Sequence, residues 1–527
     1  MQKIIQLSIT LIFTFIIISF TSSVYAQAKP MNNVENLESV LVHIVNRAEQ
    51  LGLDNAAAYA ARRNIPIING KVQVIVIINP DKIPNPWQLA AVANGIEMEG
   101  SYANRVQMIV PILALKVLAR QDGIEFVRLP LEASLEAVTS EGVEVVGATS
   151  YHAAGYTGQN VKVAILDLGF DGYDGLLGTE LPSTVVAKSF YGDPTGDSGD
   201  ITGGGQPHGT ACAEIVYDMA PGAQFYLVNY LTEVEFGNAV DWLVSQGVDT
   251  ITYSVGWVND GDYDGRGFLC SIVNTARLND VLWFNAIGNQ AQKHYEGTFT
   301  DEDDNDWHEF DSDDDTLSFE GQEGQILKVF LSWNAWPTTA EDYDFYLYDE
   351  DLNPIDTGGG QNTQSGSQPP MESIFYTLPY TGAYHLKVQS VSTTTPHHLE
   401  IYSFTHQFPE YNVPESSLMI PADADGAFAV GATYWEDDSL EDFSSQGPTN
   451  DGRIKPELAA PDGVTTVTDG STNFYGTSAS SPHVAGAAAL LWSRSPGYTA
   501  DGVEYLLKSN ALDLDPAGVD NLTGWGR

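Results

Sequence analysis

Cysteine and positive charge are both scarce in this sequence. Its two cysteines, Cys212 and Cys270, are too few for a disulfide framework, and no Cys/His spacing typical of a metal site accompanies them. Lys and Arg number 23 against 70 Asp and Glu, for a net charge of -47. This charge disfavours nucleic acid as a partner, because a phosphate backbone requires a basic surface. We interpret the acidity as a solvated surface, with salt adaptation and cation binding as the alternatives.

Long apolar runs are absent after the N-terminus. Ile4–Phe20 is apolar apart from small or polar interruptions, Lys3 precedes it, and residues 24–26 include the small residues that a signal peptidase prefers. The pattern predicts a signal peptide over residues 1–26, cleaved after Ala26, and a membrane anchor is the alternative. We therefore expect a secreted protein, extracellular or periplasmic, without stable membrane insertion after signal removal.

Residues 27–131 are predicted to form a small α+β domain. Apolar residues recur at helical spacing between Leu37 and Arg63. Further along, strands are expected at Val72–Ile78, Arg105–Pro111 and Ile124–Arg128, and helices at Pro86–Ala93 and Ile112–Arg120. Strands separated by helices are typical of a compact α+β unit, and an ordinary accessory domain is one interpretation of it.

An α/β pattern occupies residues 132–292. Val161–Leu166 is a nearly continuous β-branched and apolar run, as expected of a parallel strand buried on both faces. Strands at Gln224–Tyr230, Asp249–Val255 and Val281–Ile287 then alternate with helices at Phe236–Gln246 and Leu269–Leu278. The alternation predicts an α/β domain with a doubly wound, mostly parallel sheet, whose functional residues gather at the carboxyl ends of the strands.

Residues 293–415 interrupt that pattern with an all-β segment. Short strands separated by turns are expected at Ile326–Trp333, Tyr343–Tyr348, Ser373–Leu378, Ala383–Val388 and His398–Phe404. They predict a β-sandwich. Because the α/β pattern resumes at Ala427–Ala432, the sandwich is an insertion, and residues 416–527 complete the α/β domain.

The insertion contains an acidic run, Asp301–Asp315. It does not fit an EF-hand loop, because its sixth position is Asp306 rather than Gly and its twelfth is Ser312 rather than Glu. We interpret the run as a solvated loop, with a cation site as the alternative. The sequence leaves structural calcium open without identifying a site.

The stretch Gly476–Leu491 is a small-residue turn followed by an Ala-rich apolar run, which predicts a buried helix. Pro482 is expected in its first turn, where a missing N–H costs little. Ser478 would then lie at the helix N-terminus, beside backbone N–H groups that suit a developing oxyanion. A serine that merely caps a buried helix is the alternative.

A serine hydroxyl becomes a good nucleophile only when a base takes its proton and a carboxylate orients that base. The candidate base is His208, which follows a turn and begins an expected helix. The candidate carboxylate is Asp167, at the end of the strongest strand. Asn289, which follows another strand, is the candidate oxyanion donor beside the Ser478 N–H. Cys212 lies four residues after His208 and is expected on the same helix face.

These four residues, in the order Asp, His, Asn and Ser, resemble the motifs of the subtilase (subtilisin-like) serine peptidases. Ser254, Val255 and Gly256 resemble the strand that binds the substrate backbone in that family. The segments Phe443–Pro448 and Lys455–Pro461 resemble the part that precedes its serine. The resemblance covers roughly residues 145–292 and 416–527.

The resemblance implies a secreted serine endopeptidase that acts on polypeptides, requires no cofactor for its chemistry and is made as a zymogen. Residues 27–131 then resemble a propeptide, another partner of the enzyme, and removal is expected between about Leu131 and Val145. The inserted sandwich resembles small modules appended to many secreted peptidases.

The sequence departs from the family pattern beside two of the candidate residues. Leu168 replaces a usual Ser or Thr, so Asp167 loses a hydroxyl partner. Ala211 and Glu214 replace the commoner His and Gly after the base, and the segment Glu214–Ala220 is too short for the family's calcium loop.

Two other functions remain as alternatives. A degenerate subtilase that processes only itself could act as a binding or scaffold protein, although all its triad residues are present. A lipase or esterase is disfavoured, because Ser480 replaces the second Gly of the Gly-x-Ser-x-Gly motif around Ser478.

Overall fold

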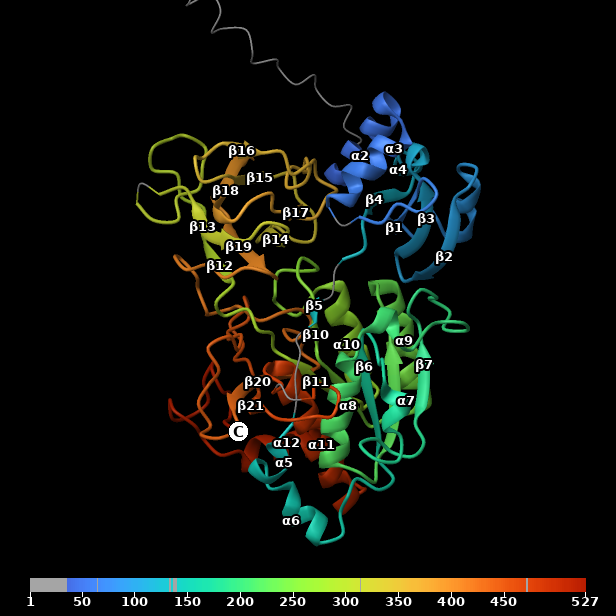
Figure 1. The fold of residues 1–527 in the computed structure, drawn as a ribbon, viewed down its shortest axis with the longest axis vertical. Helices are drawn as coiled ribbons and strands as arrows, with labels where there is room; N and C mark the ends of the chain where they lie inside the picture. Colours follow the sequence, from blue (N-terminus) through green and yellow to red (C-terminus); the bar gives the residue numbers. More distant parts are fainter. Residues whose placement is uncertain (1–35, 64, 132–133, 136–139, 313, 471–472) are drawn as a thin grey trace, which may run out of the picture. The chain divides into compact units, whose positions relative to one another are not determined.

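A seven-stranded parallel sheet organises the α/β domain (Figure 1). The computed structural model describes residues 36–63, 65–131, 134–135, 140–312, 314–470 and 473–527, so the predicted signal peptide lies outside the described residues. The strand order is β21-β20-β11-β9-β6-β8-β7, and each neighbouring pair is parallel. The fold class predicted from the sequence is confirmed. The strands are β6 (Lys162–Asp167), β7 (Val186–Ser189), β8 (Gln224–Asn229), β9 (Thr250–Tyr253), β11 (Leu282–Ala286), β20 (Ala427–Tyr434) and β21 (Leu458–Asp462).

Helices cover both faces of this sheet (Figure 1). On β6, Val163 and Ile165 pack with α8 (His208–Met219) and α11 (Thr477–Arg494), whereas Ala164 and Leu166 pack with α9 (Glu233–Gln246) and α10 (Phe268–Leu278). Alternate side chains are thus buried on opposite faces, as the continuous apolar run predicts. The remaining elements of this domain are α5 (Gly142–Val145), α6 (Ala148–Ala153), α7 (Tyr173–Leu176), η3 (Gly203–Gly205), β10 (Val255–Gly256) and α12 (Ala500–Asn510).

The N-terminal segment has an antiparallel sheet of order β2-β3-β1-β4. The segment expected to be a helix at 86–93 is a 3-10 helix over 86–91, and β2 was not predicted. Its elements are α2 (Ser39–Leu51), α3 (Leu53–Ala61), β1 (Lys71–Ile78), η1 (Pro86–Ala91), β2 (Glu97–Tyr102), β3 (Arg105–Pro111), η2 (Ile112–Ala114), α4 (Leu115–Ala119) and β4 (Ile124–Arg128).

Two antiparallel four-stranded sheets form the β-rich segment after β11. Their orders are β12-β19-β14-β17 and β13-β18-β15-β16, and a core of aromatic and aliphatic side chains fills the space between them. The five strands expected from the sequence are present, and β12, β13 and β16 are additional. The strands are β12 (His294–Thr298), β13 (Leu317–Gly321), β14 (Ile326–Trp333), β15 (Asp342–Tyr348), β16 (Pro354–Ile355), β17 (Met371–Thr377), β18 (Gly382–Ser392) and β19 (His398–Ser403).

The expectation that Pro482 lies in the first turn of its helix is wrong. α11 begins at Thr477 with Gly476 as its N-cap residue, so Pro482 lies in the second turn. Proline has no N–H to donate to the carbonyl oxygen four residues earlier, which is that of Ser478. That carbonyl instead accepts hydrogen bonds from outside the helix, as described below.

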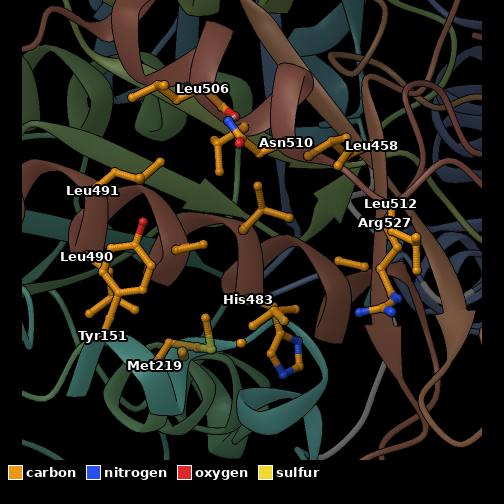
Figure 2. Close-up of a pocket in the computed structure, with 18 of the residues that line it drawn as sticks. Tyr151, Met219, Leu458, His483, Leu490, Leu491, Leu506, Asn510, Leu512 and Arg527 are labelled. Atoms are coloured by element: carbon orange, nitrogen blue, oxygen red, sulfur yellow. Dashed lines mark hydrogen bonds between the residues drawn. The ribbon is translucent and has the colours of Figure 1, made fainter. Parts of the chain in front are cut away.

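A cavity of about 600 Å³ lies beside the C-terminal half of α11 (Figure 2). Apolar side chains line much of it, among them Leu490 and Leu491 of α11 and Leu506 of α12. None of the four candidate catalytic residues lines this cavity. Among the described residues, no helix is both long enough and apolar enough to cross a membrane.

Close packing of α11 on α8 leads to a stability prediction. A Cβ atom at Gly486 would overlap the Cβ of Met219 and lie 3.0 Å from its Cγ. Overpacking costs about 1–3 kcal/mol, more than the roughly 1 kcal/mol gained in helix propensity. We expect Gly486→Ala to lower the melting temperature by roughly 2–6 °C in a thermal unfolding scan.

Gly502→Ala is the matched control within α12. The nearest atom to a Cβ there would be Thr499 Oγ1 at 3.5 Å, an ordinary contact. This variant should keep or raise the melting temperature. Equal melting temperatures for the Gly486 variant and the parent would show that the two helices can separate without cost.

Candidate active site

The carboxyl ends of three sheet strands bring the candidate residues to one edge of the domain. Asp167 is the last residue of β6, Ser254 follows β9, and Asn289 comes shortly after β11. Parallel strands expose their final residues at the same edge, so residues far apart in the sequence meet there. Each of these three side chains is at most 5% exposed.

Asp167 and His208 form a close buried pair. His208 Nδ1 lies 2.9 Å from Asp167 Oδ1 and 2.8 Å from Oδ2. The backbone N–H of Leu168 also donates to Asp167 Oδ1 at 2.8 Å. Leu168 has no hydroxyl to donate, and its main-chain N–H donates to the Asp167 carboxylate instead.

Ser478 is the second residue of α11 and is bonded to Ser254 in both directions. Its hydroxyl donates to the Ser254 carbonyl oxygen at 3.1 Å, and its own carbonyl accepts from Ser254 Oγ at 2.9 Å. The Cys212 thiol is 3.6 Å from the same Ser478 carbonyl. These donors satisfy the oxygen that Pro482 leaves without an intrahelical partner.

Thr477 fixes the orientation of the Asn289 side chain. Asn289 Oδ1 accepts hydrogen bonds from the backbone N–H and the hydroxyl of Thr477, each at 3.0 Å. Two donors at this oxygen set the direction of the amide plane and leave its NH₂ end as the donating group. Sequence reasoning missed Thr477, although its position next to Ser478 was the available signal.

Cys212 lies on the same side of α8 as His208, as expected from the spacing. Ligand-type atoms of Asp167, His208 and Cys212 lie within 4.8 Å of one another. Burial raises the pKa of the Cys212 thiol well above its ordinary value, and the nearby Asp167 charge adds to this effect. The thiol is therefore a neutral neighbour of the pair at physiological pH.

Glu214 has a structural function that its sequence pattern did not indicate. It is buried on α8 and accepts hydrogen bonds from the backbone N–H groups of Val467 at 2.8 Å and Thr468 at 3.2 Å. The next residue, Asp469, interacts electrostatically with His208, which opposes the rise in Asp469 pKa caused by burial. Glu214 therefore holds the loop that carries a charged neighbour of the base.

The segment Ser254, Val255 and Gly256 is paired with another part of the chain. β10 forms an antiparallel pair with β5 (Ser134–Leu135), with Val255 opposite Leu135 and Gly256 opposite Ser134. An extended segment added to an exposed strand is a common way to bind a peptide backbone. β10 directly follows Ser254, which contacts Ser478, so this pairing lies beside the candidate nucleophile.

The site as a whole is suited to acyl transfer. A histidine oriented by a carboxylate, a serine at a helix N-terminus and an amide donor are the groups that this chemistry uses.

Known proteins share sequence and fold with this chain. The subtilase family model matches residues 411–526, a range that includes Ser478 but neither Asp167 nor His208. An extracellular serine protease of Serratia marcescens is 42% identical over 79 residues, 15% of this chain and 8% of that protein. Subtilisin E of Bacillus subtilis (strain 168) is 26% identical over 214 residues, 37% of this chain and 52% of that protein. The chain thus spans about half of subtilisin E and a small part of the Serratia protease.

A solved structure supports the same fold over more of the chain. The structure of the Clostridium perfringens CspB protease has a TM-score of 0.54 and 16% sequence identity, and the match covers 74% of this chain and 97% of that chain. This chain is therefore similar in sequence to the subtilase family over residues 411–526 and to the subtilisins, and it has the fold of a solved protease.

Proposed function

We propose that this chain is a secreted serine endopeptidase that hydrolyses polypeptides and is made as a zymogen. The buried Asp167–His208 pair, at 2.8–2.9 Å, is the observation that carries the proposal, because Ser478 of the family motif begins a helix at the same edge of the sheet. The names of an extracellular relative and of subtilisin E agree with this activity and compartment.

In the proposed reaction, the Ser478 hydroxyl exchanges its bond to the Ser254 carbonyl for one to His208 Nε2. His208 takes the proton as Ser478 Oγ attacks the substrate carbonyl, and Asp167 stabilises the resulting imidazolium. The Asn289 NH₂ group and the Ser478 backbone N–H donate to the oxyanion. His208 then protonates the leaving amine, and water releases the acyl group by the same steps in reverse order.

The zymogen part of the proposal is supported by the contacts of the N-terminal domain. Arg105 donates to Asp260 Oδ1 at 2.7 Å, Arg128 is bonded to Glu233 at the start of α9, and Gln107 donates to Glu235 at 3.1 Å. These buried pairs join the N-terminal domain to the α/β domain. β5 follows that domain and pairs with β10, as a peptide substrate would do in this proposal.

Replacement of the proposed nucleophile tests the chemistry. Ser478→Ala should reduce hydrolysis of a chromogenic peptide by on the order of 10⁴-fold or more, because no hydroxyl remains to form the acyl-enzyme. It should also prevent covalent labelling by a sulfonyl fluoride.

Ser480→Ala is the matched control for that experiment. Ser480 lies in the same helix, and its hydroxyl donates to the Ala460 carbonyl at 2.9 Å, away from the reacting groups. The control should retain labelling and most of the activity. Labelling of Ser478→Ala at the parent rate would refute the assignment of the nucleophile.

Maturation should remove the N-terminal domain by cleavage just after β5, between Leu135 and Gly142. β5 pairs with β10, which directly follows Ser254, a hydrogen-bond partner of Ser478, and this pairing supports a cleavage site close to β5. N-terminal sequencing of secreted protein should find this new terminus in the parent and not in Ser478→Ala. Active secreted parent that still begins near Gln27 would contradict the zymogen proposal.

The contact between Tyr102 and Gly237 gives a test of inhibition by the N-terminal domain. A Cβ at Gly237 would lie 2.6 Å from ring atoms of Tyr102. Overpacking of about 1–3 kcal/mol should raise the inhibition constant of the added N-terminal domain roughly tenfold or more in Gly237→Ala. Gly175→Ala, where a Cβ would meet no atom within 4 Å, should leave it unchanged. Equal inhibition of both variants would rule out this docking surface.

A further inference from the structure

One face of the β12–β19 strand pair carries an unusual set of buried polar side chains. Tyr295 of β12 and Leu399 and Ile401 of β19 belong to the core of the sandwich. Side chains alternate between the two faces of a strand, so their neighbours lie on the opposite face. These neighbours are His294 and Glu296 on β12 and His398, Glu400 and Tyr402 on β19.

The buried part of this polar face packs against the α/β domain. Tyr402 stacks on Tyr263, with ring centroids 5.1 Å apart, and Tyr402 is fully buried. His294 is 0% exposed and Glu400 is 3% exposed. Two histidines and two glutamates are therefore concentrated at the junction between the sandwich and the α/β domain.

The two glutamates lie directly opposite each other in the strand register. Glu296 pairs with Glu400, an arrangement that is unfavourable for two like charges without a cation between them. His398 Nε2 lies 3.0 Å from Glu296 Oε2. Ligand-type atoms of Glu296, His398 and Glu400 all lie within 4.8 Å of one another.

One buried oxygen of the cluster, Glu400 Oε2, has no hydrogen-bond partner among the described residues, and it lies 4.0 Å from His294 Nε2. His294 Nδ1 donates to the Val413 carbonyl oxygen at 2.8 Å, which orients the ring.

Groups around the cluster fix the other ends of these side chains. Val413 holds the His294 ring, and the Asn450 amide donates to Glu400 Oε1, so Oε2 is the oxygen directed at the cluster. Outer hydrogen bonds of this kind orient the histidine and carboxylate ligands of metal sites.

We propose that Glu296, His398 and Glu400 bind a divalent transition metal of the zinc class, beside the buried His294 ring. Zinc binds imidazole nitrogen and carboxylate oxygen and can complete its four ligands with water, whereas calcium and magnesium sites are built from oxygen ligands. The metal neutralises the two opposed carboxylates. The His398 side chain is 35% exposed and that of Glu296 18% exposed, which gives the ion access from solvent.

The position of this site indicates a structural function. Its three ligands join two neighbouring strands, and its outer partner Asn450 belongs to the α/β domain. His294 also follows Asn289 closely along the chain. Zinc would therefore hold the sandwich against the α/β domain near the start of the insertion, and it would take no part in the peptidase chemistry.

Metal binding by the full chain tests this proposal. The parent is the Ser478→Ala chain, which avoids self-cleavage, stripped with a chelator and then titrated with zinc against a chromogenic competitor. We expect one zinc per chain. Glu400→Gln and His398→Gln should each weaken zinc binding by at least about tenfold, and Asn450→Ala by roughly 10–100-fold. Cobalt in place of zinc should give a tetrahedral visible spectrum that the ligand variants lose.

Two control measurements distinguish a loss of zinc binding from a loss of folding. His398 is partly exposed, so in the absence of zinc His398→Gln and the parent should have the same melting temperature. Zinc should raise the melting temperature of the parent but not that of His398→Gln. His385→Gln, which alters a sandwich histidine bonded to Ser318, should bind zinc like the parent. Absence of stoichiometric zinc, equal affinities in all variants, or binding of calcium in preference to zinc would overturn the proposal.

Discussion

The reciprocal hydrogen bonds between Ser254 and Ser478 are the constraint on which the site depends. They join the end of β9 to the first turn of α11, and each serine is both donor and acceptor. The bond to the Ser478 carbonyl exists because Pro482 cannot donate to it. A proline within a helix normally destabilises it by leaving a buried carbonyl unsatisfied, and here that carbonyl is bonded to the sheet and lies near Cys212 of α8. The position of the proposed nucleophile, Ser478, is therefore set by three elements together.

The same constraint aligns the remaining groups of the site. Thr477 precedes Ser478 and holds the Asn289 amide, so the helix that carries the hydroxyl also orients the proposed oxyanion donor. Ser254 is followed by β10, so the residue that contacts Ser478 also positions the strand that pairs with β5. Buried polar networks of this kind favour a single arrangement, because any displacement leaves a donor or acceptor unpaired.

Much of this arrangement could be predicted from the sequence. The features that could not be predicted were missed for physical reasons. The run Val161–Leu166 predicted β6 because a doubly buried strand needs apolar residues on both faces. The pairing of β5 with β10 involves only main-chain groups, so side chains give no signal for it. The first turn of α11 consists of small residues, which do not mark where the helix begins. Pro482 was therefore predicted in the first turn, whereas it lies in the second. β12 was missed because its buried His and Glu side chains resemble those of an exposed loop.

That polar strand also explains how the insertion can have one docked position. Stacking of Tyr402 on Tyr263 contributes attraction, but aromatic contacts tolerate sliding. Buried carboxylates and imidazoles do not tolerate sliding, because a group that loses its partner stays desolvated without a compensating hydrogen bond. Glu400 accepts from Asn450 across the junction, and Asn259 donates to the Leu331 carbonyl of β14 at 3.3 Å. These directional bonds fix the sandwich in one register against the domain that carries the active site, and apolar burial then stabilises that register.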